Sequence, residues 1–82
     1  MSLIKDFRSY LLEDNLKINV YEKCVNIINY ININHFDDNL VIIKYNNGFI
    51  DIKGNNLVVT KLLNNEILIE GIIKSVELKW KI

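Results

Sequence analysis

The stretch from residue 46 to residue 78 most constrains what this chain can fold into. It reads NNGFIDIKGNNLVVTKLLNNEILIEGIIKSVEL, in which apolar and polar residues alternate and Asn/Gly pairs interrupt the alternation. A period of two places successive side chains on opposite faces of a strand, and Asn and Gly accept the backbone angles of tight turns. The pattern therefore predicts short strands joined by tight turns.

The Asn47-Gly48 pair is the sharpest local turn signal in this stretch. Both residue types tolerate positive φ, which the two central positions of a type I′ hairpin turn require. Apolar residues flank the pair on both sides, in residues 40–45 and 49–53. The sequence thus predicts a hairpin with this pair at its tip.

A similar sequence pattern, an Asn-Asn pair followed by an I-x-I segment and a Gly, occurs twice in this stretch. In each copy an Asn-Asn pair precedes an I-x-I segment, which leads to Gly54 in the first copy and to Gly71 in the second. A Gly between two strands marks a bulge, bend or turn that a Cβ would obstruct. Because a repeat array generally needs three or more copies, two similar hairpins in one sheet are the preferred interpretation. The alternative is a short β-solenoid that stacks end to end.

Residues 2–14 have the pattern of one amphipathic helix. Ser2 suits the N-cap, and Asp6 lies near the positive end of the helix dipole. The apolar residues with helical spacing are Leu3, Phe7, Tyr10 and Leu11. A lone helix of this length is marginal in water, so its apolar side must dock, either on the sheet of its own chain or on a partner.

The remaining segments also have strand patterns. Strands are expected at residues 16–21 and 25–34, followed by a polar loop at 35–39. Residues 57–60 are apolar on both faces, which indicates a strand covered on both sides. In residues 76–82 apolar side chains point in and charged ones point out, which suits a guarded edge strand.

The predicted fold is therefore all-β with a single helix before it. We expect a small antiparallel sandwich or partly open barrel of about seven short strands. The 82 residues form one domain, with the helix at 2–14 and the β domain at 16–82.

Composition excludes several classes of protein. The formal net charge is zero, so nothing favours binding to nucleic acid or to an anionic lipid surface. No uncharged apolar stretch approaches about 18 residues, and Asp6 interrupts the N-terminus, so we expect neither membrane insertion nor a signal peptide. The single cysteine, Cys24, rules out an internal disulfide and fits a reducing cytoplasm.

The sequence contains no convincing catalytic or metal-binding set. His35 lies beside Asp37 and Asp38, but three ligands in one short loop lack the separated placement of catalytic zinc sites. A turn with Asx-type hydrogen bonds explains these residues better. Cys24 lacks a group that would orient it toward His35 as a nucleophile. We therefore expect no enzyme activity, no cofactor and no metal.

Two apolar residues stand on the polar rows of their strands. Phe49 shares a face with Asp51, and Leu68 shares a face with Glu70. If both side chains are exposed, they form an apolar patch of the kind that marks association surfaces. A covering helix or a bulge would remove that patch. The candidate interaction surface thus comprises the helix residues above together with Phe49 and Leu68.

The core of this stretch resembles the YabP/YqfC family of sporulation proteins. Members carry a G-x-L-x-I-x-G-x-x-L-x-I segment followed by an I-x-I-x-G-x-I-x-x-I segment. The first is matched by Gly48, Ile50, Ile52, Gly54, Leu57 and Val59. The second is matched by Ile67, Ile69, Gly71, Ile73 and Val76, with Val in place of the usual final Ile. The resemblance covers roughly residues 25–78.

The resemblance implies a protein made in the mother cell of an endospore-forming bacterium. The family is associated with building the spore coat and cortex and has no established enzyme activity. We therefore expect a non-enzymatic scaffold or adaptor that acts through protein–protein contacts in the mother-cell cytoplasm, at the forespore outer membrane. A membrane-bound sporulation protein is the implied partner. The alternative function is a self-assembling β-structural protein that forms oligomers or filaments.

Overall fold

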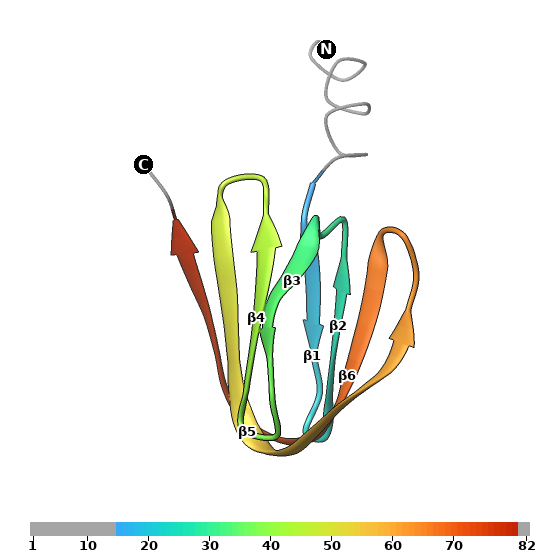
Figure 1. The fold of residues 1–82 in the computed structure, drawn as a ribbon, viewed down its shortest axis with the longest axis vertical. Coiled ribbons are helices and arrows are strands. Elements are labelled where there is room, and N and C mark those ends of the chain that lie inside the picture. Colours follow the sequence, from blue (N-terminus) through green and yellow to red (C-terminus); the bar gives the residue numbers. More distant parts are fainter. Residues whose placement is uncertain (1–14, 81–82) are drawn as a thin grey trace, which may run out of the picture.

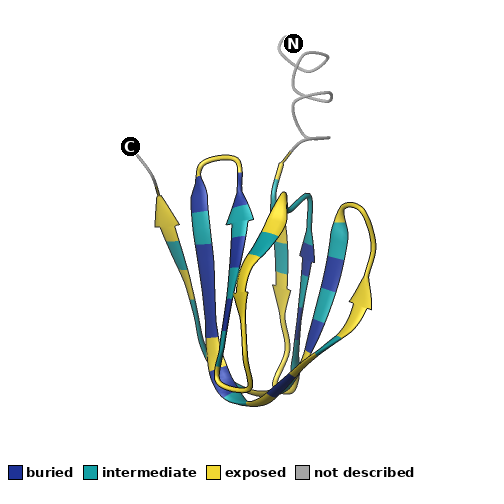
Figure 2. Ribbon diagram, in the orientation of Figure 1, coloured by how far each residue is buried: buried dark blue, intermediate teal, exposed yellow. Residues whose placement is uncertain are grey.

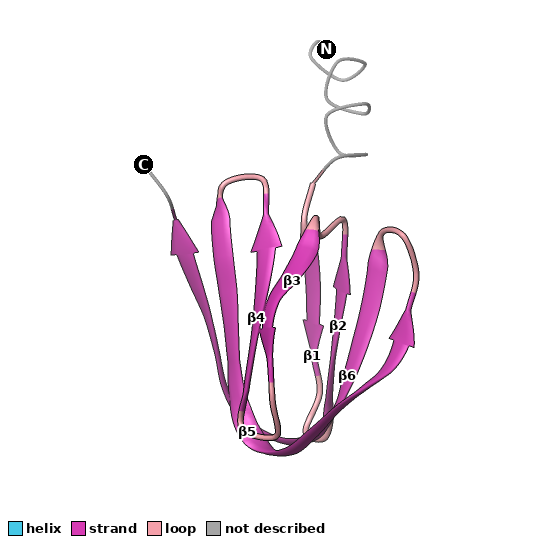
Figure 3. Cartoon of the chain, in the orientation of Figure 1, coloured by secondary structure: helices cyan, strands magenta, loops and turns pink. Residues whose placement is uncertain are grey.

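The computed structural model describes residues 15–80, which form one antiparallel sheet of six strands (Figure 1). The strands are β1 (Lys17–Val20), β2 (Cys24–Ile28), β3 (Asn32–Phe36), β4 (Leu40–Tyr45), β5 (Gly48–Leu62) and β6 (Glu66–Trp80). Their order across the sheet is β1-β2-β6-β5-β4-β3 (Figure 3). The all-β antiparallel prediction is confirmed, whereas the β-solenoid alternative is wrong. The predicted helix at 2–14 lies outside the described residues.

The two long strands, β5 and β6, bend together and divide the sheet into two arms (Figure 1). The first arm contains β3, β4, residues 48–53 of β5 and residues 75–80 of β6. The second arm contains β1, β2, residues 58–62 of β5 and residues 66–70 of β6. No described pairing joins β1 to β3, so the sheet is not closed. The result corresponds to the partly open barrel among the predicted forms.

The core lies between the two arms. Alternation turns one row of each strand inward, and these rows are rich in β-branched residues, which pack well on a pleated surface. The fully buried aliphatic residues are Val25, Ile27, Val41, Ile43, Ile50, Ile52, Leu57, Ile67 and Ile69 (Figure 2). Each contributes about 1.5–3 kcal/mol through removal of its side chain from water. The I-x-I segments of the sequence thus supply the centre of the core.

Glycines permit the bend of the β5–β6 ribbon. A Cβ at Gly54 would collide with the backbone carbonyl oxygen of Ile72. Gly71 has a φ of +142°, and a Cβ there would lie 2.7 Å from the carbonyl oxygen of Asn56. Asn56 itself has a φ of 56°, which Asn tolerates better than most residues. The pairing register of the two strands shifts between Lys53 and Gly54.

Loops from both arms hold this bend in place. The backbone N–H of Gly54 donates to the carbonyl of Asn39 at 3.1 Å, and that of Gly71 donates to the carbonyl of Lys23 at 3.0 Å. The Asn39 side chain donates in turn to the carbonyl of Gly54 at 3.2 Å. The bend is therefore fixed by contacts between segments far apart in the sequence.

The hairpin between β4 and β5 differs by one residue from the prediction. Tyr45 pairs with Gly48, so the two residues at the tip are Asn46 and Asn47. Gly48 is the first residue of β5, where a Cβ would collide with the carbonyl oxygen of Lys79. Gly48 is therefore needed for close approach of two strands rather than for the tip of the turn.

The described residues hold six strands instead of about seven. β5 runs through Gly54 and β6 runs through Gly71, because the ribbon bends there without ending. The predicted strand at 25–34 is divided in two, at a break where Asn29 has a φ of 72°. His35 and Phe36, predicted to be in a loop, belong to β3.

Two exposure predictions were also wrong. Residues 57–60 are not covered on both sides, since the side of β5 that carries Val58 faces solvent and Val58 is 51% exposed. Val76 and Leu78 face inward as predicted and pack against the core. Trp80 continues their row but is 67% exposed, because the arms diverge at that end. Ile82 lies outside the described residues.

Candidate functional site

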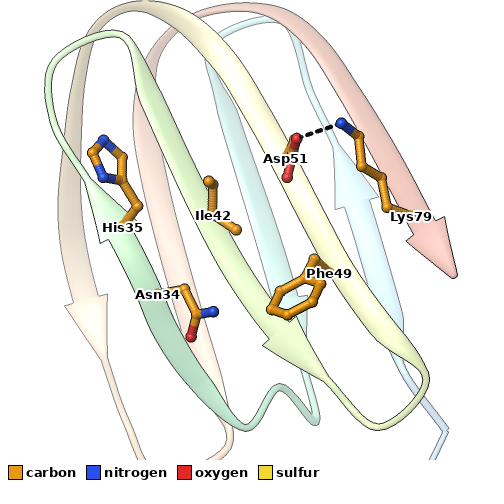
Figure 4. Close-up of a pocket in the computed structure, with 6 residues that line it drawn as sticks. All are labelled: Asn34, His35, Ile42, Phe49, Asp51 and Lys79. Atoms are coloured by element: carbon orange, nitrogen blue, oxygen red, sulfur yellow. Dashed lines mark ion pairs between the residues drawn. The ribbon is translucent and has the colours of Figure 1, made fainter. Parts of the chain in front are cut away.

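A hollow of about 380 Å³ lies on the outer face of the first arm (Figure 4). Its lining residues come from all four segments of that arm: Asn34, His35, Ile42, Phe49, Asp51 and Lys79. Cross-strand register brings them together, since Ile42 pairs with both His35 and Asp51, and Phe49 pairs with Lys79. A bulge at Asn34 turns β3 at this point.

The floor of the hollow is apolar. Ile42 and Phe49 are both half-buried and lie on the outer row, opposite the core. The Lys44 ammonium lies 5.2 Å from the centroid of the Phe49 ring, within the range of a cation–π contact. The Phe49 ring therefore contacts the Lys44 ammonium and also lines the hollow.

An ion pair forms one wall of the hollow. Nζ of Lys79 lies 3.1 Å from Oδ2 of Asp51. Asp51 is 8% exposed, although it stands on an outer row, because neighbouring side chains cover it. The hydrogen bond that Lys79 donates to Asp51, the negative charge of Asp51 and the charge of Glu77 raise the pKa of Lys79. Lys79 therefore releases its proton less readily than a free lysine side chain.

The opposite rim is fixed by the turn between β3 and β4. The ring Nε2–H of His35 donates to Oδ2 of Asp37 at 2.8 Å. Oδ1 of Asp37 accepts the backbone N–H groups of Asn39 and Leu40, both at 2.8 Å. The His35 hydrogen bond and these two backbone bonds lower the pKa of Asp37. The prediction of an Asx-type turn at these residues is confirmed.

The geometry offers little to acid–base or metal chemistry. Among residues 15–80, no three His, Cys, Asp or Glu side chains lie close enough to hold a metal ion. Cys24 belongs to the second arm and His35 to the first, so the fold does not bring them together as a nucleophile and base. The hollow instead presents an apolar floor with a polar rim, which suits recognition of another molecule.

The fold separates the two apolar residues that the sequence singled out. Phe49 lies on the outer face of the first arm, whereas Leu68 lies on the outer face of the second, paired with Asn26 and Lys61. Leu68 is half-buried beside a polar network in which Asn26 donates to Glu66 at 2.9 Å. The two residues therefore do not form one patch. The candidate helix residues Leu3, Phe7, Tyr10 and Leu11 lie outside the described residues.

Sequence reasoning missed four of the lining residues. Asn34, Ile42, Asp51 and Lys79 are unremarkable in the sequence, and only the strand pairings bring them to one hollow. Asp51 was the residue that could have indicated the hollow, because it lies between the core residues Ile50 and Ile52 and on the same strand face as Phe49. Of the four predicted turn residues, Asn47 lies at the tip of the hairpin between β4 and β5. The other three, Gly48, Gly54 and Gly71, lie where a Cβ would collide with the backbone of the neighbouring strand.

Comparison with known proteins identifies the family of the chain. No curated protein and no solved structure matches it significantly. Within residues 15–80 there is no helix of the length and apolar character needed to span a membrane. The model of the YabP family matches residues 13–81, which includes both I-x-I segments and all six strands. The chain therefore belongs to the YabP family, which associates it with sporulation.

Proposed function

We propose that this protein is a non-enzymatic scaffold or adaptor in morphogenesis of the spore coat and cortex. It acts by binding other proteins through the outer face of its first arm. The observation that carries the proposal is the hollow there, whose floor of Ile42 and Phe49 stays half-buried and without a cover among the described residues. An apolar floor inside a polar rim is the composition of a protein-recognition surface.

The partner we propose is a membrane-bound sporulation protein. Membership of the YabP family supports a role in sporulation, and the hollow supports a contact with an apolar side chain flanked by polar groups. The protein would then lie in the mother-cell cytoplasm, at the outer membrane of the forespore. Lys79 and Asp51 at the wall would select the charges next to the inserted side chain.

Pairs of matched variants test this face. Phe49→Asp in the full chain should abolish co-purification with the membrane fraction of sporulating cells, while circular dichroism stays unchanged. Leu68→Asp places the same charge on the outer face of the second arm and should leave co-purification intact. If Leu68→Asp abolishes co-purification and Phe49→Asp does not, the partner contacts the second arm, and the assignment of the contact to the first arm is wrong.

A fluorescent fusion followed through sporulation tests the location separately. The expected signal is a shell around the developing spore that is absent from growing cells. A diffuse signal in growing cells would contradict the role in sporulation whatever the behaviour of the Phe49 variant.

Self-assembly is a second candidate function, favoured by unpaired strand edges. Residues 58–62 of β5 pair only with β6, and residues 72–80 of β6 pair only with β5 among the described strands. Each leaves one row of backbone groups free to pair with another copy. Sedimentation velocity distinguishes the two functions, since assembly predicts species that grow with concentration, whereas an adaptor alone gives one discrete species.

A further inference from the structure

The C-terminal half of β6 has a regular strand edge without a neighbour. Residues 75–80 each pair with one residue of β5, and no register shift interrupts these pairs. No described strand pairs with them on their other side, and Figure 1 shows this half of β6 at one side of the molecule. We call residues 75–80 the β6 edge. A regular unpaired edge presents a row of backbone N–H and C=O groups that can pair with a further strand.

The other edges of the described sheet are short or irregular. The edge strand β1 has four residues. A register shift interrupts β3 between Ile33 and His35, and another interrupts residues 58–62 of β5 between Val59 and Lys61. Such irregularities increase the twist of an edge and disfavour pairing with another chain. Within residues 15–80, the β6 edge is therefore the one best suited to receive a strand.

The inner row of the β6 edge leaves apolar surface in contact with solvent. Val76 and Leu78 are only half-buried, although both pack against the core. Trp80, at the end of the same row, is 67% exposed. Tryptophan is highly buried on average, and neighbouring exposed apolar side chains mark association surfaces. The inner row thus favours an apolar neighbour beside this strand.

The outer row of the β6 edge has an acid without a cation of its own. Glu77 stands directly opposite Asp51 of β5, so two acids face each other across the strands. Lys79 pairs with Asp51 at 3.1 Å, and within residues 15–80 Glu77 makes no ion pair. The Lys79 side chain remains 58% exposed while it makes its pair. The edge therefore carries an unpaired acid and, two residues away, an accessible cation.

We propose that two copies of this chain pair through their β6 edges, in an antiparallel register centred on Leu78. Leu78 then lies opposite Leu78 of the second copy. Glu77 of each copy lies opposite Lys79 of the other on the outer face, and Val76 lies opposite Trp80 on the inner face. Because the arrangement has a twofold axis, each of these pairs occurs twice. Directly opposed side chains in an antiparallel pair are in contact, so each Glu77 gains a cation and each Trp80 gains an apolar neighbour.

Other registers of the same two edges lack this match. A register centred on Glu77 places two glutamates opposite each other, and one centred on Lys79 does the same with two lysines. Like charges directly opposite destabilise a strand pair. A register centred on Val76 leaves Glu77 opposite Ser75, without a cation. The formal net charge of the chain is zero, so no overall repulsion separates two copies. Charge complementarity thus selects a second copy, in one register, as the occupant of this edge.

The dimer would present both hollows on one surface. Directly opposed residues share a face of a sheet, so the outer faces of the two first arms lie on the same side of the joined sheet. The Lys79 wall of each hollow lies beside the twofold axis, because β6 is the strand that pairs. A protein that contacts both hollows would gain avidity. This consequence rests on the proposed function, whereas the pairing itself requires no other protein.

Sedimentation equilibrium of the full-length protein tests the pairing. We expect a monomer–dimer equilibrium that stops at twice the chain mass of 9.6 kDa. The emission of Trp80, the only tryptophan, should shift to the blue as the dimer forms. Glu77→Lys should raise the dissociation constant at least about tenfold, because two opposite-charge pairs become two like-charge pairs. Glu70→Lys makes the same change of charge in the second-arm part of β6 and should leave the constant unchanged.

Disulfide cross-linking tests the register in a chain with a smaller change. In a Cys24→Ser background, Leu78→Cys should form an intermolecular disulfide under mild oxidation, since opposed Cα atoms of an antiparallel pair lie about 4.5–5.5 Å apart. Glu77→Cys should cross-link more slowly, because residue 77 is opposite residue 79 of the other copy. Equal rates would refute the register, and this comparison still decides it if Glu77→Lys fails to fold.

Two outcomes of sedimentation would overturn the proposal. One is a monomer at every concentration, and the other is growth beyond the dimer, which would show that copies join through different edges. Neither outcome alters the expected effect of Phe49→Asp on co-purification with membranes. Failure of the dimer is therefore distinguishable from failure of the proposed function.

Discussion

Replacing Gly54 with alanine tests the account of the bend most directly. The new Cβ would collide with the carbonyl oxygen of Ile72 and would lie 3.0 Å from Cδ2 of Leu57. The first of these neighbours is backbone, so it cannot rotate away as the end of a side chain would. Either β5 or β6 must shift, and the shift falls where Gly54 also exchanges hydrogen bonds with Asn39.

The expected loss can be estimated from these contacts. Overpacking against a rigid neighbour costs about 1–3 kcal/mol. Weakening the two hydrogen bonds to Asn39 removes about 1 kcal/mol each. Alanine lowers the conformational entropy of the unfolded chain, which offsets about 0.4–1 kcal/mol of the lost stability. The net prediction for Gly54→Ala is a loss of about 3 kcal/mol, a large share of the roughly 4–12 kcal/mol expected for a domain of this size.

Urea denaturation followed by circular dichroism measures this loss. With a slope of roughly 1 kcal/mol/M, the midpoint should fall by about 3 M. Lys53→Ala is the matched control, because Lys53 is the preceding residue and is exposed, and it should change stability by no more than about 0.5 kcal/mol. A Gly54→Ala midpoint equal to that of the control would show that the strands do not approach as closely as described.

Three other changes have defined outcomes. Lys79→Met should lower the urea midpoint slightly at low salt, because it leaves the buried Asp51 carboxylate without its partner. The difference in midpoint should shrink at high salt, and an equal difference at both salt concentrations would contradict the ion pair. The pKa of Asp37 is lowered in the folded state, so its contribution is present above its ordinary pKa of about 3.9 and is lost as pH falls below it. In Asp37→Asn, stability should therefore fall less steeply with acid than in the wild type, and parallel profiles would refute a role for the bonds from His35 and the turn. Tyr45→Phe removes a buried hydroxyl that has no partner among the described residues, so it should leave stability within about 1 kcal/mol or raise it; a larger loss in thermal unfolding would reveal a partner for that hydroxyl.

Much of the fold follows from local patterns. The alternation of Ile50 and Ile52, and of Ile67 and Ile69, predicts strands with one buried face, and all four side chains are fully buried. The resemblance to the YabP family also rests on these segments, and the family is confirmed by a match over residues 13–81. Such features depend only on residues near one another in sequence, because the side-chain period of a strand is a local property.

The candidate site was predicted only in part. Phe49 was identified as an apolar residue on a polar row, and it lies on the floor of the hollow. Asn34, Ile42, Asp51 and Lys79 were not, because their proximity results from the pairing of β3 with β4, of β4 with β5 and of β5 with β6. Phe49 and Leu68 could not be separated from the sequence, since both stand on the outer row of similar I-x-I segments.

The sequence by itself determined the strand-forming segments, the inward rows and the positions at which a Cβ would be obstructed. Only the tertiary structure decided what the glycines do: Gly54 and Gly71 mark one bend in a continuous ribbon rather than the ends of separate strands. The physical reason is that a glycine in the sequence indicates a position with restricted space or an unusual φ, but it does not indicate which segment of the chain causes the restriction. That segment is the opposite strand of the ribbon, 18 residues from Gly54 at Ile72, and its approach is set by the packing of both arms around the shared core.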